Sequence, residues 1–495
     1  MSVSSPNPLA PSWLELPADA NALPASVWSH NAERSTDGEL LIAGVGAENL
    51  AAEFGTPLYV VDEADVRDRA RGIRDSFDRE FARVGTTVKV YYAGKAFLST
   101  QVAAWMIDDG LNIDVCSGGE LAVALAGGAP AARLGLHGNN KSLGEIDRAV
   151  SVGLGAIVLD SLIEIERVAD AAARHSRVQG VRLRVNSGVH ASTHEYLATA
   201  REDQKFGIPL ADVPATVALI RARPELEFLG LHSHIGSQIF ESDGFAEAAR
   251  RLFAVHVELL ADGPVPELNL GGGFGIAYTS ADVALPIDVL AANLADAVAG
   301  LAAEFGVDVP VIAIEPGRSI IGPSTTTLYT VGTIKDVLVS TVPEPVERPE
   351  SVEGPESVER PGASTSSATG AVRKYVSVDG GMSDNIRPAL YAADYSARIA
   401  NRSSDADAAL VRVAGKHCES GDIVVHADYL PGDVAPGDLL AVPATGAYGW
   451  AMASNYNYLG RAPVVAVRDG VARIIVRGET EADLLSRDAG LENNA

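Results

Sequence analysis

The sequence is poor in cysteine and in basic charge. Its two cysteines, Cys116 and Cys418, lie too far apart to suggest a disulfide framework or a zinc-binding spacing. The formal net charge is -26, which disfavours binding to nucleic acid or to an anionic membrane. An acidic surface can attract cationic metabolites, but solubility and the habitat of the host are the commoner explanations.

Long apolar segments are absent as well. No uncharged run reaches the roughly 18 apolar residues that a membrane-spanning helix requires. Residues 1–16 have neither the basic nor the apolar region of a signal peptide. We therefore expect a cytoplasmic protein that has no membrane partner and no metal site.

Aromatic residues make up 6% of the chain, whereas 47% of its residues are hydrophobic, with many Ala, Val, Gly and Leu. Small apolar side chains allow helices to pack closely on strands, which favours an α/β protein. The 495 residues are enough for two or three domains.

Eight short apolar segments with Ala-rich helical stretches between them dominate the first two thirds of the sequence. The expected strands are Val88–Ala93, Asn112–Cys116, Arg133–His137, Ala156–Leu159, Val181–Val185, Phe228–His232, Glu267–Leu270 and Val311–Ile314. Polar residues follow nearly every strand, and a (β/α)8 TIM-type barrel brings all such strand ends to one face. A doubly wound open sheet is the alternative, but there only the strands near a switch point can meet.

The remaining chain predicts a C-terminal β-rich domain, either barrel-like or sandwich-like. Its expected strands are Val331–Val339, Tyr375–Val378, Leu410–Val413, Leu439–Val442, Pro463–Arg468 and Ala472–Val476. We predict a loose leader at 1–23, a segment at 24–60 that contributes to the β domain, the barrel at 61–328 and the β domain at 329–495. An acidic, Pro-rich insert at 342–370 is expected to be a disordered loop.

Lys95 follows the first predicted barrel strand, directly after Gly94. A partly desolvated lysine can lose its proton and hold an aldehyde cofactor covalently. The alternative is a lysine that only extends from the strand end to solvent.

Groups suited to the rest of such a cofactor follow the sixth to eighth strands. Gly271–Gly275 with Gly273 at its centre, Ser237 and Arg318 can bind a phosphate. Glu315 can face a pyridine nitrogen, and His234 can stack on the ring. The alternatives are a structural ion pair for the glutamate and a buried core position for the histidine. Together with Lys95, this set points to pyridoxal 5'-phosphate.

The β domain adds further candidates. Cys418 stands beside Glu419 among polar, turn-forming residues, where a thiol could deliver a proton to a carbanion. Arg387 is suited to a substrate carboxylate, and Tyr391 lies close to it in sequence. Tyr448 lies between small residues and could reach the phosphate, although a packing role is the alternative.

Seven motifs in this order resemble the diaminopimelate decarboxylase family of fold-type III pyridoxal-phosphate enzymes. They are Tyr-Tyr-Ala-Gly-Lys95, His-Ser-His234-Ile-Gly-Ser237, Gly-Gly-Gly273-Phe-Gly, Glu315-Pro316-Gly317-Arg318, Ser-Asp-Asn-Ile-Arg387-Pro-Ala-Leu-Tyr391, His-Cys418-Glu419-Ser-Gly-Asp and Gly-Ala-Tyr448. The resemblance spans residues 40–480 approximately. It implies decarboxylation of meso-2,6-diaminopimelate to L-lysine and CO2, the last step of lysine biosynthesis.

The resemblance also implies roles for these residues. Lys95 would hold the cofactor, His234 would stack on it, and Cys418 would donate the proton after CO2 leaves. The other implied cofactor contacts are Ser237, Gly273, Glu315, Pro316, Gly317, Arg318 and Tyr448. The implied substrate contacts are Arg318, Arg387, Tyr391, Glu419 and Tyr448. Relatives of this kind form homodimers with active sites at the interface, where the Cys418 segment reaches the partner's cofactor.

Two other functions remain open. A decarboxylase of another basic amino acid, of the ornithine or arginine type, would share the cofactor site but would not need Arg387 for a distal carboxylate. A non-catalytic protein that binds pyridoxal 5'-phosphate would be expected to have lost Lys95 or Cys418, and both are present.

Overall fold

A computed structural model describes residues 7–189, 205–340 and 370–490. Eight parallel strands form a closed barrel, because β13 pairs with β5 and β8 pairs with β9 around the ring. The barrel strands are β5 (Val88–Ala93), β6 (Asn112–Val115), β7 (Leu134–Leu136), β8 (Ala156–Leu159), β9 (Gln179–Asn186), β11 (Leu226–His232), β12 (Glu267–Asn269) and β13 (Val311–Ile314). The predicted TIM-type barrel is confirmed.

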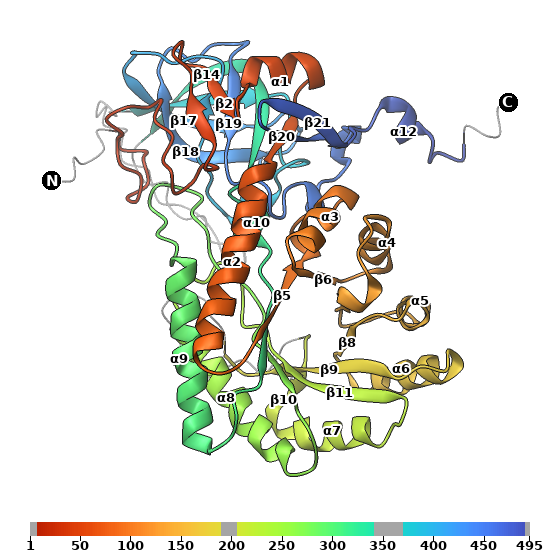
Figure 1. Ribbon diagram of the computed structural model, residues 1–495. Coiled ribbons are helices and arrows are strands. Elements are labelled where there is room, and N and C mark those ends of the chain that lie inside the picture. Colours follow the sequence, from red (N-terminus) through yellow and green to blue (C-terminus); the bar gives the residue numbers. More distant parts are fainter. Residues whose placement is uncertain (1–6, 190–204, 341–369, 491–495) are drawn as a thin grey trace, which may run out of the picture.

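Helices surround the barrel in the lower half of Figure 1. They are α2 (Glu63–Arg83), α3 (Thr100–Asp108), α4 (Gly118–Ala126), α5 (Leu143–Val152), α6 (Leu162–Arg174), α7 (Val213–Arg221), α8 (Asp243–Leu260), α9 (Ile287–Phe305) and the short α10 (Arg318–Ile321). Ser99, Ser117 and Ser142 cap three of these helices immediately after strand–helix turns. Their alanine-rich inner faces pack on the strands in one continuous apolar core.

A second domain lies above the barrel in Figure 1 and is built mainly of β-structure. Its main sheet has the order β18-β17-β15-β14-β4-β20-β21, and β19 joins both β14 and β16. The strands are β4 (Leu58–Asp62), β14 (Thr325–Ser340), β15 (Gly370–Val378), β16 (Arg398–Ile399), β17 (Ala408–Ala414), β18 (Ile423–Pro431), β19 (Leu439–Val442), β20 (Val464–Arg468) and β21 (Val471–Val476). The predicted C-terminal β-rich domain is confirmed.

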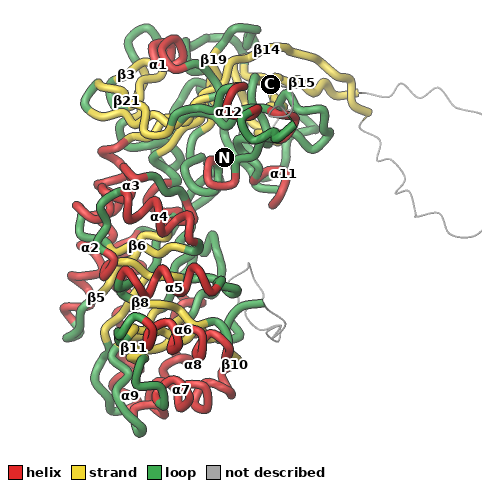
Figure 2. Tube along the Cα trace, turned by 90° about the vertical axis from the view of Figure 1, so that its right-hand side faces the viewer, coloured by secondary structure: helices red, strands yellow, loops and turns green. Residues whose placement is uncertain are grey.

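The long strands β14 and β15 pair antiparallel and run side by side away from the sheet in Figure 2. Residues 341–369, which contain all but the last residue of the predicted insert at 342–370, lie outside the described residues. The predicted boundaries of the leader, barrel and β domain stay a prediction.

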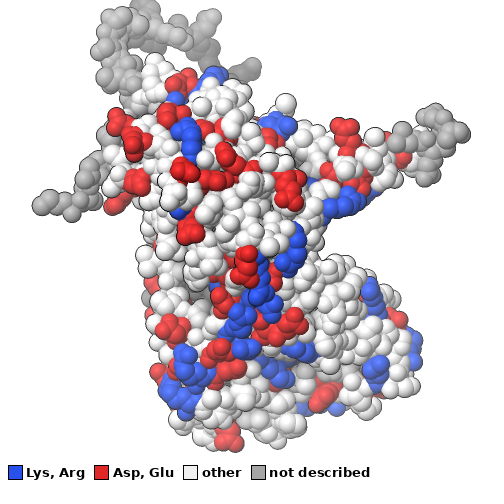
Figure 3. All heavy atoms as spheres, turned by 45° about the horizontal axis from the view of Figure 1, so that its top comes forward, with Lys and Arg blue, Asp and Glu red and all other residues white. Residues whose placement is uncertain are grey.

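Smaller elements complete the described chain. They are β1 (Ala32–Arg34), β2 (Leu40–Ile42), β3 (Val45–Gly46), α1 (Ala47–Phe54), β10 (Ile208–Pro209), α11 (Arg387–Tyr391), α12 (Glu481–Leu485) and the 3-10 helices η1 (Gly94–Ala96), η2 (Ala131–Arg133), η3 (Leu210–Asp212), η4 (Trp450–Met452) and η5 (Tyr456–Tyr458). Among the described residues, no helix combines the length and the apolar character needed to cross a membrane. Acidic and basic side chains are interspersed over the face drawn in Figure 3.

A buried ion pair fixes the loop that follows β7. The Nζ atom of Lys141 donates to the carbonyls of Gly138 and Val158, both at 2.6 Å, and to Oε2 of Glu164 at 3.0 Å. Glu164 also accepts the backbone N–H of Asp160 at 2.8 Å. Because both charged side chains are almost fully buried, neither has water as an alternative partner. This pair therefore ties together the ends of two neighbouring strands at the mouth of the barrel.

We expect Glu164→Ala to destabilise the fold by about 3 kcal/mol or more, because it leaves the Lys141 ammonium buried without its counter-charge. Glu166→Ala, two residues further along α6, removes an exposed ion pair with Arg223 and should cost less than about 1 kcal/mol. Urea unfolding of the cofactor-free protein measures both changes. Equal losses of stability would contradict the structural role of the buried pair.

Candidate active site

A cavity of about 820 Å³ lies at the C-terminal ends of the barrel strands and extends to the β domain. The predicted site residues that line it are Lys95, His234, Ser237, Gly273, Glu315, Gly317, Arg318, Arg387, Tyr391 and Tyr448. Pro316, Cys418 and Glu419 are predicted site residues of the described chain that lie outside this lining. The strand ends therefore converge as the barrel geometry requires.

Lys95 stands in η1, which directly follows β5 and exposes the side chain at the cavity. A side chain at Gly94 would clash, because a Cβ there would lie 2.8 Å from the carbonyl oxygen of Asp114. The backbone N–H of Tyr448 donates to the Ala96 carbonyl at 2.9 Å and so joins η1 to the β domain. The amine thus projects from a fixed turn rather than from a loose loop.

Glu315 follows β13 and lies in a cluster of buried polar side chains. Its Oε1 accepts a hydrogen bond from Nδ2 of Asn269 at 2.8 Å and lies 3.0 Å from Nε2 of His232. Nε2 of His137 lies 3.5 Å from the same oxygen and 3.1 Å from Oδ1 of Asp114. The glutamate is thus surrounded by groups that can fix its orientation.

The two acids of this cluster differ in pKa. Burial acts to raise the pKa of the Glu315 carboxyl, but the neighbouring His232 and His137 hold that pKa well below its ordinary value. Burial raises the pKa of Asp114 to about 6, with the charge of Glu315 acting in the same direction. Glu315 therefore keeps its negative charge to a lower pH than Asp114, which is protonated as the pH falls through about 6.

His234 is a neutral imidazole at the cavity wall. Burial and, to a smaller extent, the nearby Lys95 lower its pKa to about 3. Its Nδ1 accepts the backbone N–H of Gly272 at 3.4 Å, a long contact that orients the ring only weakly. An uncharged flat ring at this place suits stacking on an aromatic ligand.

Arg318 joins several of the predicted phosphate contacts. Its Nη2 donates to Oγ of Ser237 at 2.9 Å, and its Nη1 donates to the hydroxyl of Tyr278. The guanidinium carbon lies 4.7 Å from the ring centre of Tyr448. Within the described chain, the buried Nε of Arg318 has no hydrogen-bond partner. The arginine therefore retains a donor for an anionic group.

Arg387 begins α11 and is almost fully buried. Its guanidinium carbon lies 3.9 Å from the ring centre of Tyr278 and 5.2 Å from that of Tyr395. In the described part of the protein, its buried Nη1 has no hydrogen-bond partner. Tyr391, at the other end of this helix, is exposed beside the cavity. A buried guanidinium with an unused donor is prepared for an anion.

Pro316 supports the site through its backbone, since its carbonyl accepts the N–H of Ala93 at 2.9 Å. Cys418 and Glu419 lie in the turn between β17 and β18, and both are exposed. Oε1 of Glu419 accepts only local bonds, from Oγ of Ser420 at 3.3 Å and the N–H of Gly421 at 3.4 Å. The thiol and this carboxylate therefore do not belong to the cavity of their own chain.

The sequence analysis missed several residues of the site. Asp114, His137, His232, Arg184 and Cys116 line the cavity, and Asn269 binds Glu315. Cys116, His137 and His232 ended predicted strands, a position that could have marked them. Asp114 and Asn269 lay inside the predicted strands, where an isolated polar residue gives no such indication, although the structure ends β12 at Asn269.

His137, His232 and Glu315 offer ligand atoms within 4.8 Å of one another, close enough to hold a metal ion. No metal site was predicted from the sequence. We assign Glu315 to a different partner below, and the two histidines serve to orient it.

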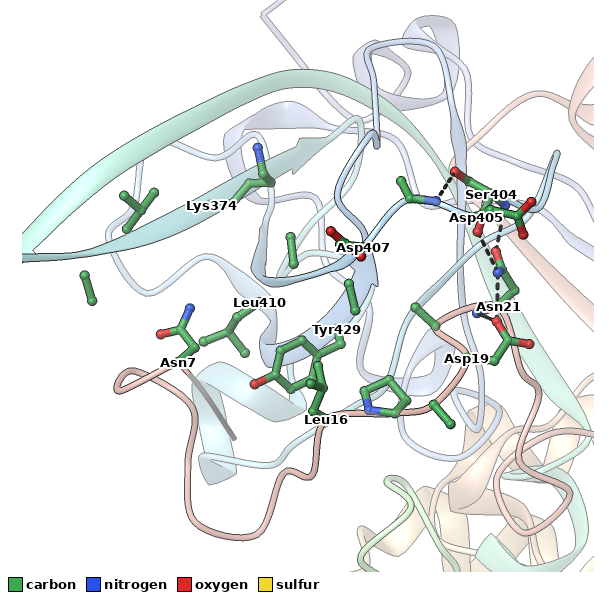
Figure 4. A pocket seen from close by; sticks show the side chains of 18 of the residues that line it. Asn7, Leu16, Asp19, Asn21, Lys374, Ser404, Asp405, Asp407, Leu410 and Tyr429 are labelled. Carbon is green, nitrogen blue, oxygen red and sulfur yellow. Dashed lines mark hydrogen bonds between the residues drawn. The ribbon is translucent and has the colours of Figure 1, made fainter. Parts of the chain in front are cut away.

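A second cavity, of about 950 Å³, lies on the β domain away from the barrel mouth. Residues of the N-terminal segment, including Asn7, Leu16 and Asp19, line it opposite Lys374 and Asp407 (Figure 4). None of the predicted site residues lines it. This cavity is therefore not part of the predicted active site.

Comparison with known proteins places the chain in a family. Residues 64–322 match the pyridoxal binding domain of pyridoxal-dependent decarboxylases, and residues 323–446 match their C-terminal sheet domain. A diaminopimelate decarboxylase of Mycobacterium leprae (strain TN) is 47% identical over 476 residues, which cover 94% of this chain and 93% of the relative. This chain belongs to the diaminopimelate decarboxylase family.

Other members of the diaminopimelate decarboxylase family agree with this assignment. The Bacillus subtilis (strain 168) enzyme is 42% identical over 455 residues, covering 91% of this chain and 95% of the relative. The crystal structure of the M. jannaschii diaminopimelate decarboxylase in co-complex with L-lysine superposes with a TM-score of 0.79 at 29% identity. That similarity covers 93% of this chain and 98% of the solved one.

The diaminopimelate decarboxylase family is pyridoxal-dependent, and pyridoxal 5'-phosphate is the cofactor of this chain. The residues of the cavity fit this group. A Cβ at Gly272 or Gly273 would lie 2.0 Å or 2.2 Å from a backbone oxygen, so this loop packs tightly and leaves no side chain over the cavity. The Nε of Arg318, which has no partner among the described residues, is suited to donate to a phosphate, and the ionised Glu315 is suited to face a ring nitrogen.

We expect His234→Phe to reduce the loss of stability at low pH in the cofactor-free protein. Wild-type His234 binds its proton only near pH 3, whereas the unfolded chain binds it near pH 6.5, so stability falls as pH drops through this window. Between pH 6.5 and 5 the wild type should lose about 2 kcal/mol more than the variant. Urea unfolding at both pH values measures the difference.

His256→Phe provides an independent check away from the cavity, because burial lowers the pKa of His256 to about 4. His256→Phe should shift the pH dependence of the free energy of unfolding in the same direction and leave cofactor binding unchanged. If the free energy of unfolding of His234→Phe fell with pH as steeply as that of the wild type, the result would contradict a neutral imidazole at the cavity wall.

Proposed function

We propose that this protein decarboxylates meso-2,6-diaminopimelate to L-lysine and CO2. The observation that supports this substrate most directly is Arg387, a buried guanidinium at the cavity wall whose Nη1 has no partner among the described residues. A substrate with a distal carboxylate satisfies this donor, whereas ornithine would leave it unpaired. An unsatisfied buried charge is costly, so the site discriminates against the shorter diamine acids.

The residues divide the work of the reaction. The amine of Lys95 would hold the aldehyde of the cofactor covalently. When bound, pyridoxal 5'-phosphate would supply an electron sink for the bond that breaks between the α-carbon and its carboxylate. Glu315 would pair with the protonated ring nitrogen, and the neutral His234 would stack against the ring. Ser237, Gly273, Gly317, Arg318 and Tyr448 would hold the phosphate, and Pro316 fixes their loop to β5.

We further propose that substrate recognition is shared between the barrel and the β domain. Arg387 and Tyr391 bind the distal end of the substrate, and Arg318 and Tyr448 border both ligands. Glu419 is suited to the distal amine. Cys418 donates the proton that the α-carbon requires after CO2 has left, because only protonation at that carbon gives lysine.

Cys418 and Glu419 lie outside the cavity of their own chain, which supports a homodimer in which each chain completes the site of the other. Exposed Leu390 and Tyr391 beside the cavity mouth fit such an interface. We retain the cytoplasm as the proposed location, consistent with the free thiols of both cysteines.

We expect Arg387→Met to lower kcat/KM for meso-diaminopimelate by about a hundredfold or more, because it removes a buried charged contact while keeping similar bulk. Release of CO2 and formation of lysine measure this loss. The absorbance of the bound cofactor should persist, since Arg387 contacts only substrate. Lys95→Ala is the inactive control and should form neither product.

Ornithine serves as the comparison substrate in the same assay. The wild type should strongly prefer diaminopimelate, and Arg387→Met should lose most of that preference. A wild type that turns over ornithine as well as diaminopimelate would overturn the proposed substrate.

Mixing Lys95→Ala with Cys418→Ala after reversible dissociation should restore about one quarter of wild-type activity, because half of the dimers then contain one intact site of two. Each variant alone should be nearly inactive. Lysine formation before and after subunit exchange measures this recovery. Absence of recovery, with exchange verified by mass, would contradict a site shared between chains.

A further inference from the structure

Hydrogen bonds to buried groups hold the base of the turn that carries Cys418. Oδ2 of Asp422 accepts the backbone N–H of His417 at 2.8 Å, and Oδ1 accepts that of Met382 at 2.6 Å. The backbone N–H of Lys416 donates to the Gly380 carbonyl at 2.9 Å. These bonds fix the base of the turn and stop short of Cys418 itself.

Asn457 makes the contact that reaches Cys418. Its Oδ1 lies 3.3 Å from the backbone nitrogen of Cys418 and 3.1 Å from Nδ1 of His417. Nε2 of His417 lies 2.8 Å from Oγ of Ser383, and the rings of His417 and Tyr456 lie 5.2 Å apart. One side-chain oxygen of a distant segment therefore joins the peptide of the cysteine to the histidine before it.

The donors in this chain of contacts are defined. A backbone N–H can only donate, so the atom of Asn457 that faces Cys418 is the amide oxygen and not the nitrogen. That oxygen can only accept, which places the ring proton of His417 on Nδ1. In the neutral imidazole, Nε2 of His417 then accepts from the hydroxyl of Ser383. The contact with Asn457 thus selects one tautomer of the neutral ring.

The backbone of Asn457 is also unusual. It lies in the left-handed region, with φ 53° and ψ 25°, which Asn tolerates better than other residues that have a side chain. Asn457 is exposed, so its bonds add little to the stability of the whole fold. This geometry is explained by the contact with the cysteine turn rather than by core packing.

We propose that Asn457 is a positioning residue for the thiol of Cys418. It acts by holding the backbone of Cys418 in the position from which the thiol can reach the reacting carbon. This inference rests on the proposed role of Cys418 as proton donor. A displacement of a reacting group by about 1 Å can cost about a hundredfold in rate, so a single exposed amide can matter for the reaction without mattering for folding.

Alkylation of the native protein tests the positioning directly. The chain has two cysteines, so peptide mass spectrometry after iodoacetamide treatment separates the two sites and gives the rate at Cys418 relative to that in the wild-type protein. Burial raises the pKa of the Cys116 thiol to about 12, so that site should react little. Asn457→Gly keeps the left-handed backbone but removes the amide, and should raise the relative rate at Cys418 about three- to tenfold. Asn457→Asp keeps an acceptor oxygen and should return the rate most of the way to wild type.

Asn455→Ala is the matched control in the same segment. Asn455 donates to the Leu459 carbonyl at 3.1 Å and to Glu479, and makes no contact with the cysteine turn in the described structure. It should leave the relative alkylation rate unchanged. An equal increase in Asn455→Ala and Asn457→Gly would show general loosening of the segment and would overturn the inference.

Product stoichiometry tests the consequence for the reaction. Asn457→Gly should lower kcat with little change in KM, and should release more CO2 than it forms lysine. Part of the substrate would then take its proton at the former aldehyde carbon of the cofactor instead of at the α-carbon, and hydrolysis by water would give an aldehyde and the amine form of the cofactor in place of lysine. Wild-type alkylation in Asn457→Gly, or an increased alkylation with equal CO2 and lysine, would refute the positioning role. The proposed role of Cys418 as proton donor fails separately, if Cys418→Ser forms lysine at the wild-type rate, and the proposed function fails if the wild type forms no lysine from meso-diaminopimelate.

Discussion

Closure of the eight-stranded barrel is the constraint on which the site depends. Pairing of β8 with β9 and of β13 with β5 leaves no open edge in the ring, so all eight strands deliver their C-terminal ends to one mouth. Lys95 and Glu315 come from adjacent strands of this ring, although more than two hundred residues separate them in the sequence. The amine and the carboxylate are therefore placed by strand pairing and not by local structure.

At the mouth of the barrel, the neighbouring side chains determine the pKa of each buried carboxyl group. Glu315 and Asp114 are both buried carboxyl groups near His137, yet only the pKa of Glu315 is lowered. The difference arises because His232 and His137 together outweigh the effect of burial on Glu315, whereas burial and the charge of Glu315 outweigh the effect of His137 on Asp114. Glu315 is thus the acid that keeps its charge over the wider pH range, as its proposed role opposite the ring nitrogen requires.

Much of this could be predicted from residues that follow recognisable strands. Lys95, His234, Glu315 and Arg318 each stand just beyond a run of β-branched or apolar residues, and barrel geometry alone then brings them together. The β domain was harder to predict, because β18 contains His426 and Asp428 and so breaks the apolar alternation that indicates a strand.

The positions of Cys418 and Glu419 could not be derived from local pattern either. Their place depends on how a turn of the β domain lies relative to the barrel, and in the proposed dimer relative to a second chain. The order of residues in the sequence does not by itself specify either arrangement. The motif identified these residues, and the family resemblance implied that the Cys418 segment serves a partner; the fold adds that both residues lie outside the lining of their own cavity.

Residues 446–458 join two contacts that, in the proposed dimer, belong to different active sites. Tyr448 borders the cavity of its own chain, while Asn457 contacts the turn whose thiol is proposed to serve the partner's site. Both residues have left-handed backbones, with φ of 62° and 53°, so tertiary contacts must hold this stretch in place. In that dimer, a ligand that binds one arrangement of this stretch more tightly than another would change ligand binding at the second site, and thermodynamic linkage makes the reverse effect equal in size.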